Sequence, residues 1–209
     1  MADWDGFYFH MPNGSSVFWL KIISLSLLNY ILRFARWHFF ISTLGYAVPY
    51  FRSFTIYFSA FALTLTPGKL GETVRSIFLH PYGVTYSESI GAFFSERILD
   101  FFAVYILFII CGAFLGVEII YIVVGAVVII LFFLLIKFRE CLKIVTAGRL
   151  MPLFNYTYIV LTGISFFLAP KKLMLILPLS VIAWASQGII LFLIAKTLGY
   201  ELSVYWCIA

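Results

Sequence analysis

Two short stretches of the sequence concentrate charged side chains within an otherwise apolar chain. TPGKLGETVRS at residues 66–76 carries Lys, Glu and Arg three residues apart, and SERILD at residues 95–100 carries Glu and Asp four residues apart. On a helix, residues three or four apart lie on one face. Arginine and lysine bind phosphate groups, whereas carboxylates four apart can act as a base or bind Mg²⁺. The six charged residues are Lys69, Glu72, Arg75, Glu96, Arg97 and Asp100.

The composition places these charges in an integral membrane protein. The chain has 209 residues, of which 64% are hydrophobic, 20% aromatic and only 11% charged, and its mean hydropathy is +1.07. A helix needs about 20 mostly apolar residues to cross a bilayer, and several segments have that length. We therefore predict an all-α, polytopic membrane helix bundle. The net charge of +5 is what basic residues that set membrane topology would produce, so no nucleic-acid partner is expected.

Several site types are not indicated by the sequence. The cysteines and histidines lie far apart without metal-ligand or disulfide spacing, and neither a P-loop nor a Rossmann glycine pattern occurs. We expect no metal and no cofactor. The N-terminus has two aspartates and no basic residue before its first apolar run, so we expect no cleaved signal peptide.

One membrane domain, residues 1–209, with about four spans accounts for the apolar segments. The spans are expected near residues 17–36, 90–117, 119–136 and 173–195. Most basic residues fall at helix ends that a single topology places in the cytoplasm, with the N-terminus outside. The chain is therefore predicted to be a multi-pass protein of the cell membrane.

Two further segments are predicted not to cross the membrane. Residues 54–66 are thirteen uncharged residues between basic flanks, and thirteen helical residues rise only about 20 Å. We expect a re-entrant hairpin over residues 54–79, in which Pro67 ends the incoming helix and the glycines permit the reversal. The three structural turn residues are Pro67, Gly68 and Gly71. A helix–loop–helix at the membrane surface is the alternative. Residues 154–169, also flanked by basic clusters, are expected to form an interfacial or re-entrant helix.

The six charges are expected to meet inside the bundle or at a site near the cytoplasmic interface, where water enters. Each charge at the bilayer centre costs about 2.5 to 3.5 kcal/mol, and the set holds three positive and three negative groups. Arg33 and Arg36, at the end of the first span, add two positive charges, which favours binding of a phosphate or phosphodiester headgroup. The alternative is that the ion pairs only fasten the hairpin to the next helix. The candidate substrate-binding residues are Arg33, Arg36, Lys69, Glu72, Arg75, Glu96, Arg97 and Asp100.

Four segments of the chain resemble the transmembrane domain of the lysylphosphatidylglycerol synthase/flippase superfamily. They are LNYILRFARW (28–37), TPGKLGETVRSIFL (66–79), YGV (82–84) and SERILDFF (95–102). The resemblance covers roughly residues 20–209, and it implies a lipid-handling membrane protein. The positions that match its motifs are Arg36, Trp37, Pro67, Gly68, Lys69, Gly71, Glu72, Arg75, Glu96, Arg97 and Asp100. The resemblance also implies an additional first helix and additional last helices that do not occur in this sequence.

The resemblance favours a flippase-like protein that moves a charged or glycosylated lipid between leaflets. A polyprenyl-phosphate sugar and a modified phospholipid such as an aminoacylated one are the candidate cargoes, and we favour a transporter over an enzyme. One alternative is a membrane-embedded transferase or hydrolase of a lipid phosphate, with Glu72, Glu96 or Asp100 as base or metal ligand. The other is a noncatalytic membrane subunit for a soluble transferase partner.

Overall fold

In the computed structural model, residues 15–60, 74–142, 158 and 161–208 are described. Every regular element within these residues is helical, so the predicted all-α class is confirmed. The elements are α1 (Ser16–Thr43), α2 (Tyr50–Ser59), α3 (Arg75–Leu79), the 3₁₀ turn η4 (His80–Tyr82), α4 (Tyr86–Leu115), α5 (Ile119–Leu142), α7 (Pro170–Thr197) and α8 (Val204–Ile208). Residues 161–167 form a further helical segment.

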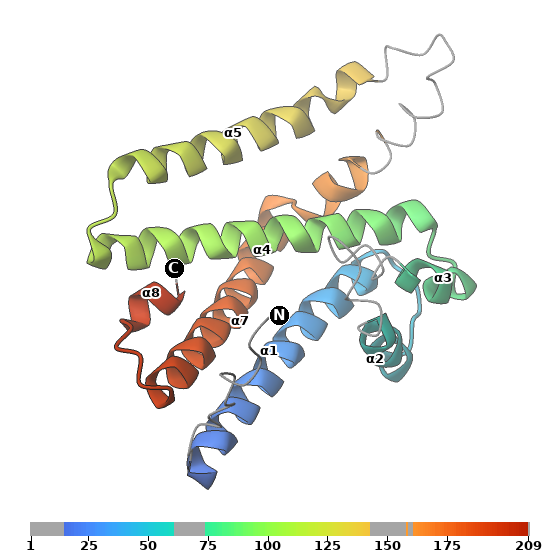
Figure 1. Cartoon of the computed structure of the whole chain (residues 1–209). Coiled ribbons are helices and arrows are strands. Elements are labelled where there is room, and N and C mark those ends of the chain that lie inside the picture. The colour runs from blue at the N-terminus through green and yellow to red at the C-terminus, as the bar shows by residue number, and fades with distance from the viewer. Residues whose placement is uncertain (1–14, 61–73, 143–157, 159–160, 209) are drawn as a thin grey trace, which may run out of the picture.

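Three of these helices are long and apolar enough to cross a membrane, namely α1, α4 and α7. Figure 1 shows that α1 and α7 lie below α4, which crosses both, while α5 runs back along α4 on its other side. Each of the three long helices packs against the other two. The protein is therefore a multi-pass membrane helix bundle.

The long helices extend beyond the spans expected from hydropathy. α1 continues to Thr43, so the arginines expected at its end lie inside the helix, and α4 already begins at Tyr86. Local sequence explains the second boundary. Thr85 accepts a hydrogen bond from the Glu88 backbone N–H while the Glu88 side chain accepts from the Thr85 N–H, which is a capping box. At the other end of α4, Gly116 takes a left-handed φ of 68°, which glycine adopts without strain.

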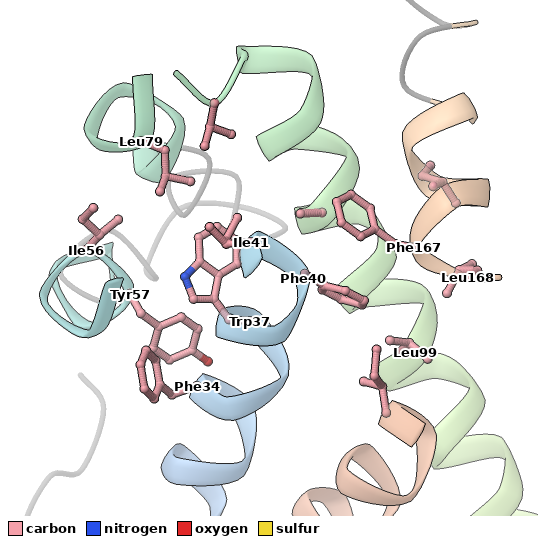
Figure 2. Packing of buried hydrophobic residues seen from close by; sticks show 14 residues of the cluster. Phe34, Trp37, Phe40, Ile41, Ile56, Tyr57, Leu79, Leu99, Phe167 and Leu168 are labelled. Carbon is pink, nitrogen blue, oxygen red and sulfur yellow. The ribbon is translucent and has the colours of Figure 1, made fainter. Parts of the chain in front are cut away.

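A buried aromatic core surrounds the last turns of α1, as Figure 2 shows. Phe34, Trp37 and Phe40 project from α1 on different sides, so that Trp37 meets Tyr57 of α2 and Phe40 meets Phe167. The ring centroids of the second pair lie 4.9 Å apart. Because aromatic pairs add to the free energy of burial, this core fixes the position of α1 relative to α2 and to residues 161–167.

Small residues bring residues 161–167 close to α4. A Cβ added to Gly91 would lie 3.3 Å from the Cα of Gly163, so the two backbones approach closely at this point. Close approach of small residues is a usual way to pack helices in membranes. The described part of the segment predicted at 154–169 is thus helical and packed, and its depth in the membrane stays a prediction.

The re-entrant hairpin also stays a prediction. Its two ends are described, as α2 and as α3 with η4, and these ends pack against each other. α2 has 10 residues and so rises only about 15 Å, which is too short to cross a bilayer. The tip, with Pro67, Gly68, Lys69, Gly71 and Glu72, lies outside the described residues.

Candidate functional site

One face of α1 carries the polar residues around which the site is built. Asn29, Arg33 and Arg36 follow one another at spacings of four and three, which places them on the same side of the helix. All three side chains are buried, and Arg36 is only 1% exposed. Since a charge buried to this degree needs a partner, the neighbouring helices must supply carboxylates.

Arg36 joins the three long helices. Its Nη1 donates to Asp100 Oδ1 of α4 at 2.7 Å and to Ser180 Oγ of α7 at 2.7 Å. Its Nη2 lies 3.7 Å from Glu96 Oε1. The short charge-assisted bond to Asp100 is the strongest type of hydrogen bond available here.

Asp100 gathers three more side chains. Its Oδ1 accepts a hydrogen bond from Trp184 Nε1 at 3.1 Å. Its Oδ2 lies 3.8 Å from Arg33 Nη1 and 3.5 Å from Arg97 Nη2. One carboxylate thus stands against three guanidinium groups, which makes it the centre of the ion-pair network.

Arg75 brings the start of α3 into the same network. Its Nη1 donates to Glu96 Oε2 at 3.1 Å. Its guanidinium also lies over the rings of Trp37 and Tyr57, 4.8 and 4.4 Å from their centroids. Cation–π contacts hold a desolvated guanidinium favourably, so the aromatic core of Figure 2 also orients the site.

We call the group formed by these six side chains the arginine–carboxylate cluster. Its members are Arg33, Arg36, Arg75, Glu96, Arg97 and Asp100. Six of the eight predicted substrate-binding residues therefore lie together. The remaining two, Lys69 and Glu72, fall outside the described residues, as do the three predicted turn residues. Arg33 and Arg36 were expected to add positive charge to a set of charges already paired with one another. Instead, Arg36 is the closest ion-pair partner of Asp100.

The α7 side of the site was not predicted. Ser180, Trp184 and Gln187 repeat the spacing of four and three seen on α1, and all three bond to the cluster. Gln187 Oε1 accepts from Arg33 Nη2 at 3.3 Å, and Arg33 lies 5.0 Å from the centroid of the Trp184 ring. This shared spacing on α1 and α7 was the sequence signal from which the contact between the two helices could have been predicted. Serine, tryptophan and glutamine occur singly in many membrane helices, so it was weak.

A second polar contact extends the site along the same two helices. Asn29 donates from Nδ2 to the carbonyl of Ala183 and to Ser186 Oγ. The carbonyl of Ala183 also accepts from the Ser186 hydroxyl at 2.7 Å. These bonds fasten α1 to α7 beside Arg33, and so keep the arginine face of α1 turned toward α4 and α7.

The described part of the cluster carries an excess of positive charge. Four arginines face two carboxylates, which leaves two positive charges over. The Nε groups of Arg33 and Arg36 and the carboxylate oxygens Glu96 Oε1 and Asp100 Oδ2 are buried and make no hydrogen bond within the described structure. A buried polar group without a partner costs about 1 to 3 kcal/mol. Among the described residues, the excess of arginine is the feature of the cluster that would attract an anionic group.

Together the fold and the cluster define a multi-pass membrane protein with a buried ionic site between three long helices. The chain belongs to the lysylphosphatidylglycerol synthase transmembrane-region family, whose model matches residues 3–208. The resemblance seen in the four sequence segments is thereby confirmed, and the match also takes in residues before position 20. No curated protein and no solved structure matches the chain. The family indicates a membrane protein that acts on lipids.

Proposed function

We propose that this protein translocates a lipid with a charged or glycosylated headgroup between the two leaflets. A polyprenyl-phosphate sugar and a modified phospholipid are the candidate cargoes. The headgroup passes the arginine–carboxylate cluster while the hydrocarbon chains stay in the lipid phase. The observation that carries this proposal is the buried cluster itself, with two surplus positive charges among its described residues and the unused Nε donors of Arg33 and Arg36.

The cost of burying these groups supports a role beyond fastening helices. Ion pairs inside a protein often contribute little net stability, because desolvation offsets their attraction. Arginine is suited to phosphate because its fork of donors matches the phosphate oxygens. A purely structural network would be better served by equal numbers of opposite charges. The surplus of arginine in the described part of the cluster therefore favours an anionic ligand.

The positions of the carboxylates favour transport over catalysis. Glu96 lies 3.1 Å from Arg75, and Asp100 lies 2.7 Å from Arg36. Each carboxylate is thus engaged by a guanidinium group in an ion pair, as in a paired polar network inside a membrane bundle. Translocation needs no covalent step, and its driving force would come from an ion gradient or from removal of the lipid on the receiving side.

Translocation in liposomes tests the proposal. The purified protein is reconstituted with phosphatidylglycerol or an isoprenyl-phosphate sugar, each with a fluorescent label that an external reductant can bleach. We expect faster loss of the protected signal than in protein-free liposomes, and unchanged lipid by mass spectrometry. Chemical turnover of the probe would instead support the transferase or hydrolase. If neither probe moves faster than in protein-free liposomes, the proposal is wrong.

A matched pair of variants assigns the effect to the cluster. Arg33→Gln removes one cluster guanidinium, whereas Arg52→Gln makes the same change at an exposed position on α2. We expect translocation to fall in the first variant and to persist in the second. Equal rates in both variants would show that the cluster does not carry the headgroup.

A further inference from the structure

A groove of about 260 Å³ lies between α4 and α5, on the side of α4 where Figure 1 places α5. The described residues of its walls are almost all apolar, and more of these residues come from α4 than from α5. The apolar lining residues are Phe94, Ile98, Phe101, Phe102, Val128 and Ile129. Several of these side chains are exposed on helices of strongly apolar sequence, so the groove opens to the hydrocarbon of the bilayer.

Specific contacts hold α5 beside α4 next to this groove. The Tyr105 hydroxyl of α4 donates to the carbonyl of Ile122 on α5. The rings of Phe102 and Phe133 stack with their centroids 5.7 Å apart and their planes inclined by 22°. A Cβ added to Gly125 would overlap the Tyr105 ring, so α5 carries a glycine where that ring must fit. A few large side chains thus connect α4 and α5, whose backbones otherwise stay apart, and the groove lies in the space between the two helices.

Arg97 joins the groove to the arginine–carboxylate cluster. Among the described residues that line the groove it is the one charged residue, and its side chain is 28% exposed. Its Nη2 lies 3.5 Å from Asp100 Oδ2, and its guanidinium lies 5.5 Å from the centroid of Phe93. The same side chain therefore has its charged end at the ionic site and forms part of the groove wall.

The geometry points to the α4–α5 groove as the binding site for one hydrocarbon chain of an anionic lipid whose headgroup is held at Arg97 and the cluster. This inference rests on the proposed function and adds to it where the chain of the cargo lies. An apolar wall that ends at one cation matches an amphiphile with an apolar chain and an anionic head. Apart from Arg97, the described residues of the walls offer a headgroup or a soluble ligand no charged partner.

Photo-crosslinking tests this placement. The probe is phosphatidylglycerol with a diazirine in one acyl chain, used with the full protein in phosphatidylcholine vesicles, and adducts are mapped by peptide mass spectrometry. A phosphatidylcholine of the same chain and diazirine reports bulk lipid. We expect adducts of the anionic probe to concentrate on the groove residues of α4 and α5, and those of the zwitterionic probe to spread over the exposed faces.

Two neighbouring valines provide a matched pair of variants. Val127 and Val128 are each 47% exposed, but only Val128 lines the groove. Val128→Trp should fill the groove and lower the labelling of the groove residues by the anionic probe by about tenfold. A tenfold loss of affinity corresponds to about 1.4 kcal/mol of binding free energy. Val127→Trp should leave that labelling unchanged. Equal labelling in both variants, or even labelling of all exposed faces in the wild type, would overturn the inference.

The two proposals fail separately in these experiments. Groove labelling without accelerated translocation would overturn the proposed function and leave the chain-binding site standing. Accelerated translocation without preferential groove labelling would overturn the chain-binding site alone.

Discussion

Removal of the Asp100 carboxylate should destabilise the protein more than removal of its closest partner, Arg36. Asp100→Asn keeps the side-chain volume but deletes the negative charge that faces three guanidinium groups. The amide would also place an N–H group toward Arg33 or Arg97, where Oδ2 now stands. Arg36 would keep Ser180 and the more distant Glu96.

The expected magnitude follows from the loss of a buried partner. Breaking a buried ion pair from one side costs about 3 to 5 kcal/mol, because the remaining charge is left uncompensated. In Arg36→Met, Asp100 would still have Trp184, Arg33 and Arg97 within 3.8 Å, so the cost should be smaller. The described cluster would hold three surplus positive charges in Asp100→Asn and one in Arg36→Met.

The free energy of unfolding in detergent or bicelles, measured by denaturant titration, checks this asymmetry. Glu118→Gln in the exposed turn before α5 is the control for loss of a carboxylate, and it should change stability by less than about 0.5 kcal/mol. An Asp100→Asn variant as stable as this control, or an Arg36→Met variant less stable than Asp100→Asn, would contradict the expected asymmetry.

Two further substitutions test the packing around the cluster. Trp184→Phe removes the hydrogen bond to Asp100 but keeps an aromatic ring, so it should lower the free energy of unfolding by about 1.5 to 3 kcal/mol, whereas Trp19→Phe at an exposed position should not. Gly91→Val places a branched side chain where the backbone of Gly163 approaches to 3.3 Å, and it should cost about 1 to 3 kcal/mol by overpacking. A thermal midpoint equal to that of the wild type would contradict either expectation.

Much of this architecture could be predicted from composition and spacing. The membrane helices follow from long apolar segments, and the meeting of SERILD with Arg75 follows from the cost of leaving charges in lipid, whereas Arg33 and Arg36 were expected beyond the paired set. Which arginine faces which carboxylate did not follow. Arg36 and Asp100 are 64 residues apart, and their pairing depends on how α1 and α4 are rotated against each other.

Other features depend on packing that no single segment encodes. Ser180 and Trp184 became part of the site because α7 lies beside α1, a contact between segments more than 140 residues apart. The groove beside Arg97 depends on the distance between α4 and α5, which Tyr105 and Phe102 set. The short connection between α4 and α5 predicts that these two helices are neighbours, but it carries no information on the space left between them.

The most direct test of the central claim is whether translocation selects anionic headgroups through the cluster. Arg33 suits this test because its ion pair with Asp100 is long, at 3.8 Å, and because Arg33→Gln removes the charge but keeps a side chain that can donate a hydrogen bond. The measurement is the ratio of translocation rates of phosphatidylglycerol and phosphatidylcholine probes in liposomes that contain wild type, Arg33→Gln or Arg52→Gln. The account predicts a ratio well above one in the wild type and in Arg52→Gln, and a clear fall in Arg33→Gln. A ratio of one in the wild type, or a ratio unchanged by Arg33→Gln, would contradict it.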